Sequence, residues 1–347
     1  MTTNMSAFRL PPEWAYNEYI LLSWPHKDSD WAYMLDEVKV CFTEIVKAAI
    51  RYAKVLIVAP DISEVAHDLK GFADMDRISM IEMPTNDTWA RDFGMICTVD
   101  SKGVVSINDF KFNGWGLKFA ACHDNLITRN IIDALAKSDN AIYANHMGFV
   151  LEGGSIDISD DGTLLTTCEC LLSPNRNGEL DKDEIEALLK NYLGCSRVLW
   201  LNHGYLEGDD TDSHVDTLAR FLPGRKIAYT ACDRLDDEHY IELSEMEREL
   251  KDFANAEGYE LISLPIPEAI YDSEGLRLPA TYANFLIINN AVLLPVYGDE
   301  RYDAIAIDKF KRAVPGYDIV PINCIPLIRQ HGSLHCVTMQ IPAGTLR

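Results

Sequence analysis

The chain has 347 residues, of which 48% are hydrophobic and 24% charged, proportions typical of a globular protein with a sizeable core. Its formal net charge of −23 at pH 7 argues against nucleic acid or anionic membranes as partners, because both are bound through Lys and Arg. The N-terminus shows no basic stretch followed by an apolar one, and no uncharged run approaches about 18 residues, so we expect a cytoplasmic protein.

Taken in chain order, the predicted elements repeat one pattern about five times: a short strand, a turn, a second apolar strand, a helix and a third strand. The fifth copy is split between the two ends of the sequence. An extra helix with a strand is predicted within 61–83, and a long surface loop at 271–279. The predicted strands are 18–24, 54–58, 89–99, 104–110, 141–143, 154–159, 163–172, 197–201, 214–221, 226–231, 259–264, 281–288, 291–297, 317–322 and 333–341, and the predicted helices are 32–51, 124–137, 181–192, 237–256 and 301–313.

This alternation predicts mixed sheets covered by external helices, and a copy completed by both ends of the sequence predicts a closed ring. We therefore expect one α/β domain over 1–347. Two ordinary α/β domains with unrelated strand order are the alternative.

One acidic stretch stands out, with five carboxylates and one imidazole between Glu207 and Asp216. If His214 to Asp216 continue as a strand into the apolar residues that follow, the period of two puts both side chains on one face. A proton carrier would then lie beside an anion, next to a binding site for a cation. The alternative is a solvated acidic loop.

Other reactive side chains fall at or near the first strand of a copy: Asp92, Glu152, His214 with Asp216, and Cys336. In a ring whose first strands line the central axis, these residues would meet in one cavity. Cys336 follows Gly332 at a junction between loop and strand and is a candidate nucleophile.

Each of these residues also has a simpler explanation. Cys336 could be a small buried hydrophobic residue, Glu152 could lie on a surface loop, and Asp92 could pair with Arg91.

The nine cysteines show no Cys-x-x-Cys spacing and are expected to be reduced thiols. Cys168 and Cys170, placed on one face of the strand predicted at 163–172, lack a His or a second Cys pair at zinc spacing. We therefore predict no metal site.

Four motifs in order, spread over nearly the whole chain, resemble the agmatine deiminase family, which also includes bacterial proteins called peptidylarginine deiminases. They are Met83-Pro-Thr-Asn-Asp-Thr-Trp-Ala-Arg-Asp92, Glu152-Gly-Gly-Ser155, Gly208-Asp-Asp-Thr-Asp-Ser-His-Val-Asp216 and Gly332-Ser-Leu-His-Cys336. The resemblance implies a pseudo-fivefold α/β propeller (pentein) with a central active-site cavity, in agreement with the repeat.

The resemblance also implies roles for individual residues. Cys336 would be the nucleophile, His214 the general acid and base, Glu152 its carboxylate partner, and Asp92 with Asp216 the clamp on the substrate guanidinium. Trp89 and Trp115 would pack on the substrate near Gly332, and Asp210 would bind its distal amine. Two segments depart from the family pattern, Asn113-Gly-Trp-Gly116 and Gln330-His-Gly-Ser-Leu334, and both bear on the far end of the pocket rather than on its reactive end.

The chemistry implied is hydrolysis of agmatine to N-carbamoylputrescine and ammonia through a covalent thiouronium on cysteine, with no metal or organic cofactor. The expected partner is this small cationic substrate, and homo-oligomer formation is left open. Two alternatives remain: a deiminase of peptidyl or C-terminal arginine, and an acidic protein that binds polyamines or basic peptides without catalysis.

Overall fold

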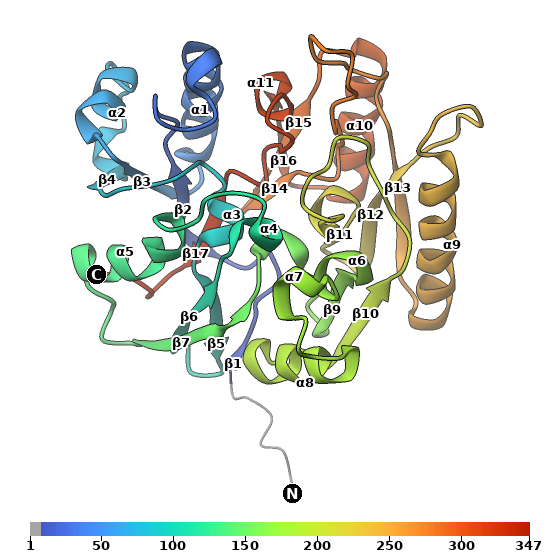
Figure 1. The fold of residues 1–347 in the computed structure, drawn as a ribbon, viewed down its shortest axis with the longest axis horizontal. Helices are drawn as coiled ribbons and strands as arrows, with labels where there is room; N and C mark the ends of the chain where they lie inside the picture. The colour runs from blue at the N-terminus through green and yellow to red at the C-terminus, as the bar shows by residue number, and fades with distance from the viewer. Residues whose placement is uncertain (1–7) are drawn as a thin grey trace, which may run out of the picture.

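The computed structural model describes residues 8–347 and arranges their strands in five small sheets that follow one another around a ring (Figure 1). In every sheet a first strand pairs antiparallel with a second, and the second pairs parallel with a third. In sheets 3 and 5 the first strand lies nearest the centre of the ring in Figure 1. Sheet 1 contains β1 (Phe8–Arg9), β5 (Ile96–Asp100), β6 (Val105–Lys111) and β7 (Ala141–Val150); sheet 2 contains β8 (Asp157–Ile158), β9 (Thr163–Thr167) and β10 (Arg197–Leu201); sheet 3 contains β11 (Ala219–Leu222), β12 (Lys226–Ala231) and β13 (Glu260–Pro265); sheet 4 contains β14 (Leu286–Ile288), β15 (Ala291–Val296) and β16 (Asp318–Asn323); sheet 5 contains β17 (Met339–Pro342), β2 (Asn17–Ser23), β3 (Lys54–Ala59) and β4 (Ile78–Glu82).

Sheet 5 closes the ring. Its first strand, β17, comes from the C-terminal part of the sequence and pairs antiparallel with β2 from the N-terminal part, with Met339 opposite Leu21. The predicted split copy and the predicted pseudo-fivefold α/β propeller are both confirmed.

Helices connect the second and third strands because two parallel strands need a crossover. The five predicted crossover helices are all present, on the outside of the ring (Figure 1), and their ends differ from the predicted ones by a few residues. The extra helix and strand predicted within 61–83 correspond to α2 and β4. The crossover helices are α1 (Leu35–Ala49), α5 (Ile127–Leu135), α8 (Lys182–Leu193), α9 (Tyr240–Glu257) and α10 (Glu300–Ala313); the shorter helices are α2 (Ile62–Asp68), α3 (Ala90–Phe93), α4 (Gly114–Leu117), α6 (Cys168–Leu171), α7 (Pro174–Asn177) and α11 (Ile325–Ile328), with 3₁₀ turns η1 (Ala32–Met34), η2 (Met75–Arg77), η3 (Asp124–Leu126), η4 (Gly153–Ser155) and η5 (Val215–Thr217).

Local sequence explains the helix ends. Asp181 caps α8 by accepting from the Glu184 backbone N–H at 2.9 Å, while the Glu184 side chain accepts from the Asp181 N–H, also at 2.9 Å. The helix ends at Gly194, whose φ of 64° is the left-handed conformation that glycine adopts without strain.

The predicted first strands are wrong in their N-terminal halves. Residues 90–93 form α3 and 215–217 form η5, while β14 and β17 start only at Leu286 and Met339. These segments hold buried polar groups that bond to side chains and turns instead of a neighbouring strand; for example, the Thr217 hydroxyl donates to the His214 carbonyl at 2.8 Å. The strand predicted at 163–172 also ends early, because the Thr167 hydroxyl caps α6 by accepting from the Cys170 N–H.

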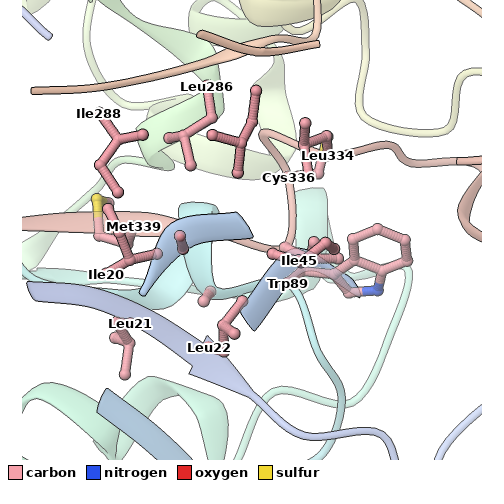
Figure 2. Packing of buried hydrophobic residues seen from close by; sticks show 14 of the residues in the cluster. Ile20, Leu21, Leu22, Ile45, Trp89, Leu286, Ile288, Leu334, Cys336 and Met339 are labelled. Atoms are coloured by element: carbon pink, nitrogen blue, oxygen red, sulfur yellow. The ribbon is translucent and has the colours of Figure 1, made fainter. Parts of the chain in front are cut away.

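The apolar core lies between the sheets and their helices. In Figure 2, side chains of β2 such as Ile20 and Leu22 face the core together with Leu286 and Ile288 of β14, and Trp89 and Cys336 border the same region. The inner strands β2 and β3 of sheet 5 are buried on both faces, as expected where helices and neighbouring sheets cover them, whereas the edge strand β4 is partly exposed. Among residues 8–347, no helix has the length and apolar character needed to span a bilayer.

Arg220 of β11 is a charged group inside this core. Its Nε donates to the Asp157 carboxylate at 2.7 Å, a second nitrogen donates to Glu13, and a third donates to the Phe285 carbonyl at 3.0 Å. One fully buried guanidinium thus joins sheets 2, 3 and 4 and the segment before β2.

We predict that Arg220→Met lowers the free energy of unfolding by about 3–5 kcal/mol, because it leaves two buried carboxylates without their cation. Arg312→Met, which removes an exposed pair with Asp308, should cost less than about 1 kcal/mol. Urea midpoints at unchanged m-value measure both. Equal midpoints for the two variants would show that the Arg220 network does not hold the sheets together.

Candidate active site

A cavity of about 30 Å³ opens between segments of several sheets and contains most of the predicted site residues. Asp92, Trp89, Trp115, Asp210, Gly332 and Cys336 all line it, together with Asp30, Asp87, Phe119, Thr211, Gln330 and His331. The remaining predicted residues, Glu152, His214 and Asp216, lie behind this lining and are fully buried.

His214 lies between two carboxylates. Its Nδ1 is 3.7 Å from Asp92 Oδ1, and its Nε2 is 3.6 Å from Glu152 Oε2. Burial alone would lower the pKa of His214, but the negative charges of Asp92 and its other neighbours raise it well above the ordinary value. This direction favours the protonated imidazole, which has a carboxylate facing each nitrogen.

Gly154 makes this approach possible. Its N–H donates to Asp92 Oδ1 at 2.9 Å, and a Cβ at this position would lie 2.6 Å from His214 Nδ1 and 3.1 Å from Asp216 Oδ2. No side chain fits there, which accounts for the Gly-Gly pair after Glu152.

Arg176 of α7 was missed in the sequence. Its Nε donates to both Glu152 oxygens, at 2.8 and 3.1 Å, and other nitrogens donate to Asp212 and to the Thr211 carbonyl. Burial raises the pKa of Glu152, but His214 and Arg176 outweigh it and hold the carboxyl ionised. The Glu152–Arg176 pair is a buried ion pair with both side chains fully covered.

Cys336 faces the cavity from the turn before β17. Its Sγ lies 3.4 Å from Asn284 Oδ1, which also accepts from the His335 N–H at 2.9 Å. Burial, together with the charges of Asp216 and Asp92, raises the pKa of the Cys336 thiol well above its ordinary value. This direction favours the neutral thiol.

Only one of the two carboxylate oxygens of Asp216 has a hydrogen-bond partner among the described residues. Its Oδ2 accepts from His335 Nδ1 at 2.7 Å, whereas its Oδ1 is buried with no hydrogen-bond partner among the described residues. Leaving such an acceptor unpaired costs about 1–3 kcal/mol or more, which a ligand N–H could recover. The free oxygen therefore indicates a donor-bearing, cationic ligand.

The two tryptophans are held in place by backbone conformation and close packing. Trp115 has φ 54° and donates from Nε1 to Asp92 Oδ2 at 3.0 Å. Trp89 packs edge to face on Trp115, with ring centroids 6.4 Å apart, and a Cβ on Gly332 would lie 2.1 Å from the Trp89 ring. The side of the cavity that departs from the family pattern is thus closely packed on indole rings.

The mouth is acidic. Asp210 lies in the lining, where the sequence predicts it. Two further acids of the lining, Asp30 and Asp87, were not predicted. Burial, with the charge of Asp30, raises the pKa of Asp87 to about 7, and burial also raises the pKa of Asp210.

Asp92, Glu152, His214 with Asp216, and Cys336 come together, but not as side chains of strands. Each lies in the turn or short helix just before the first strand of sheets 1, 2, 3 and 5. The inference that period-two geometry places His214 beside Asp216 is wrong, because 215–217 is a 3₁₀ turn. Asn284, just before β14, fills the equivalent place in sheet 4.

The residues next to the site residues face elsewhere. Arg91 and His335 line a second cavity of about 90 Å³ that shares no lining residue with the first. Arg91 donates to Gln340 at 2.5 Å rather than to Asp92, so the simpler explanation of Asp92 does not hold.

Comparisons with known proteins agree with this architecture. Residues 9–342 match the family described as Porphyromonas-type peptidyl-arginine deiminase. Agmatine deiminase of Pseudomonas aeruginosa strain LESB58 is 30% identical over 99% of this chain and 97% of its own. Among solved structures, a cysteine-to-serine variant of C. jejuni agmatine deiminase with substrate bound is 39% identical, with a TM-score of 0.90 over 98% of this chain and 97% of that one.

The structure of agmatine deiminase from Enterococcus faecalis is 28% identical, with a TM-score of 0.87. The match covers 97% of this chain and 96% of that one. The sequence match, the shared ring of five sheets and the coverage of nearly the whole chain lead to one conclusion: this chain belongs to the Porphyromonas-type peptidyl-arginine deiminase family, together with the agmatine deiminases.

Proposed function

We propose that this protein is an agmatine deiminase, a hydrolase that converts agmatine and water into N-carbamoylputrescine and ammonia. The observation that carries the proposal is the set of groups around one small cavity: two carboxylates, one with an unpaired buried oxygen, a buried imidazolium and a buried thiol. Full-length relatives named agmatine deiminase support it.

A guanidinium carries five N–H donors in a plane, and Asp92 and Asp216 offer carboxylate oxygens to receive them. The free Asp216 Oδ1 would accept one of these donors, and Asp92 would accept from the other side of the plane. Trp89 and Trp115 would cover the cation and its methylene chain. Asp210, with the other acids of the mouth, would bind the distal ammonium.

Substrate binding would also prepare the nucleophile. The negative charges of Asp92 and Asp216 keep the proton on Cys336, and a bound guanidinium neutralises that field. The thiol can then release its proton to solvent and attack the guanidinium carbon as a thiolate.

His214 is protonated in the resting site and is suited to the next step. It would give its proton to the departing nitrogen, which leaves as ammonia, with an S-alkylthiouronium remaining on Cys336. Neutral His214 would then take a proton from water, whose oxygen attacks the same carbon. The C–S bond breaks, the hydroxyl group on the carbon gives its proton to the departing sulfur, and N-carbamoylputrescine leaves. The neutral thiol and protonated His214 are restored. Arg176 would serve as a positioning residue that keeps Glu152 ionised beside His214.

The wider assignments are also proposals. The site draws on the segments before the first strands of all five sheets, so we treat 1–347 as a single catalytic domain. All nine cysteines are free thiols, typical of a reducing compartment such as the cytoplasm.

We predict that Cys336→Ala and Cys336→Ser abolish ammonia release but still bind agmatine, because the carboxylate clamp does not need sulfur. Mass spectrometry of the wild type during turnover should find a covalent adduct on Cys336. Substantial turnover by the Ala variant would remove Cys336 from the nucleophile role.

The proposed guanidinium clamp, Asp92 and Asp216, can be tested separately. Asp92→Asn and Asp216→Asn keep the shape but remove an anion, and each should lower kcat/KM roughly 30-fold or more, which corresponds to about 2 kcal/mol. Asp139→Asn, at an exposed position, is the matched control. If both clamp variants show the kinetics of the control, the two carboxylates do not bind the guanidinium.

Substrate order separates the alternatives. Agmatine should be preferred over free arginine, whose carboxylate would approach the acidic residues Asp30 and Asp210 in the lining and find like charge there. The measurement is kcat/KM for agmatine, arginine and a short arginine peptide in one buffer. A peptide that equals agmatine would assign the protein to the peptidylarginine deiminases, and binding of all three without ammonia release would favour the non-catalytic binder.

A further inference from the structure

Cys170 is a buried thiol that the proposed reaction does not use. It lies in α6 with its Sγ 3.9 Å from Glu152 Oε2, and it does not line the substrate cavity. The sequence placed Cys168 and Cys170 on the same face of a strand; the helical turn of α6 instead leaves Cys168 partly exposed beside Asn202 and turns Cys170 inward.

There Cys170 completes a set of three metal-binding side chains. One ligand atom each from Glu152, Cys170 and His214 lies within 4.8 Å of the other two, and all three residues are buried. Independently, both ring nitrogens of the fully buried His214 lack a hydrogen-bond partner among the described residues, and Nε2 is the nitrogen facing Glu152.

The spacing suits a tetrahedral ion. With the bond lengths usual for zinc, the ligand atoms of such a site lie about 3.4 Å apart for nitrogen and oxygen and about 3.6 Å apart for sulfur and oxygen. The corresponding separations here are 3.6 Å for His214 Nε2 to Glu152 Oε2 and 3.9 Å for Cys170 Sγ to Glu152 Oε2. The third pair, Cys170 Sγ and a His214 ring nitrogen, lies within 4.8 Å, so the three side chains would have to close in only slightly to share one ion.

Charge can also be balanced. A carboxylate oxygen has two lone pairs, so the bonds from Arg176 leave acceptor capacity on Glu152. Arg176 pairs with Asp212 as well as with Glu152, and the Cys170 thiolate with Glu152 would place two negative charges beside the ion.

We propose that Glu152, Cys170 and His214 form an inhibitory site for thiophilic divalent cations such as Zn²⁺ and Cd²⁺. On binding, Cys170 and His214 each release one proton to solvent, sulfur and the ring nitrogen donate lone pairs to the ion, and water can fill the fourth position. The ring nitrogen that holds the ion can no longer carry a proton, so catalysis stops until a chelator removes the metal. The inhibitory consequence rests on the proposed function; the binding site itself does not.

Cadmium reports thiolate ligation directly through its ultraviolet charge-transfer absorption. Protein freed of metal by a chelator and then desalted is titrated with Cd²⁺ in thiol-free buffer, as wild type, Cys170→Ser, Cys336→Ala and the matched control Cys168→Ser, from the same short helix. We expect one equivalent of the band in wild type, Cys336→Ala and Cys168→Ser, and its loss in Cys170→Ser. Persistence of the band in Cys170→Ser, its loss in Cys336→Ala, or no band in any form overturns the proposal.

Activity gives the second measurement. Cys170→Ser should retain ammonia release, while the Zn²⁺ concentration for half inhibition rises roughly tenfold or more, because one ligand is lost. Cys168→Ser should keep the sensitivity of the wild type. Equal Zn²⁺ sensitivity of Cys170→Ser and wild type contradicts the inhibitory role. If the wild type releases no ammonia from agmatine, the proposed function fails, and the cadmium band still decides whether the site exists.

Discussion

Charge buried at the centre of the ring is the constraint on which the rest of this structure depends. A buried ion costs several kcal/mol unless it is paired, so each charged group near the centre needs a partner from another part of the chain. Arg176 pairs with Glu152, and Arg220 with Asp157 and Glu13. These pairs fix the relative positions of segments far apart in sequence. Where pairing is incomplete, at His214 and at Asp216 Oδ1, the protein is prepared for a ligand.

The same requirement explains how the ring becomes a catalyst. Each sheet begins with a segment that enters from the centre and carries at least one polar side chain there, and these five segments differ in what they supply: an acid, an acid with a glycine pair, an imidazole with an acid, an amide and a thiol. Asn284 supplies no charge, but it receives the backbone N–H of His335 and donates to the Asp216 carbonyl at 3.3 Å. It joins the nucleophile segment to the carboxylate segment.

Much of the fold follows from the sequence because its signals are local. The amphipathic helices and most of the apolar second and third strands were predicted to within a few residues, the exceptions being β7, which is longer than predicted, and β9, which is shorter. The split copy predicted ring closure. The first strands were misjudged because alternating apolar residues around Trp89 and His214 resemble strands, whereas their buried polar groups are satisfied by turns. Only tertiary contacts decide between the two.

The motifs and the repeat predicted most of the site. The prediction was incomplete where a residue acts through a partner far away in sequence. Arg176 lies in a polar Ser-Pro-Asn-Arg-Asn segment that looks like a surface loop, and its partner Glu152 is 24 positions away. A cluster of acids that must be buried requires a cation, which was the available signal for Arg176. Asn284 could have been found from its position just before the first strand of the fourth copy.

Arg91 precedes Asp92, and His335 precedes Cys336, yet each neighbour lines the other cavity. His335 bridges Asp216 and Glu13, whose carboxylate also holds Arg220. The backbone that presents the reactive groups is therefore the same backbone that anchors the ionic core, and one side of it cannot loosen while the other stays in register. We therefore expect activity to be lost in the same transition in which the ring unfolds, and the rate of thermal inactivation to follow the rate at which the ring opens.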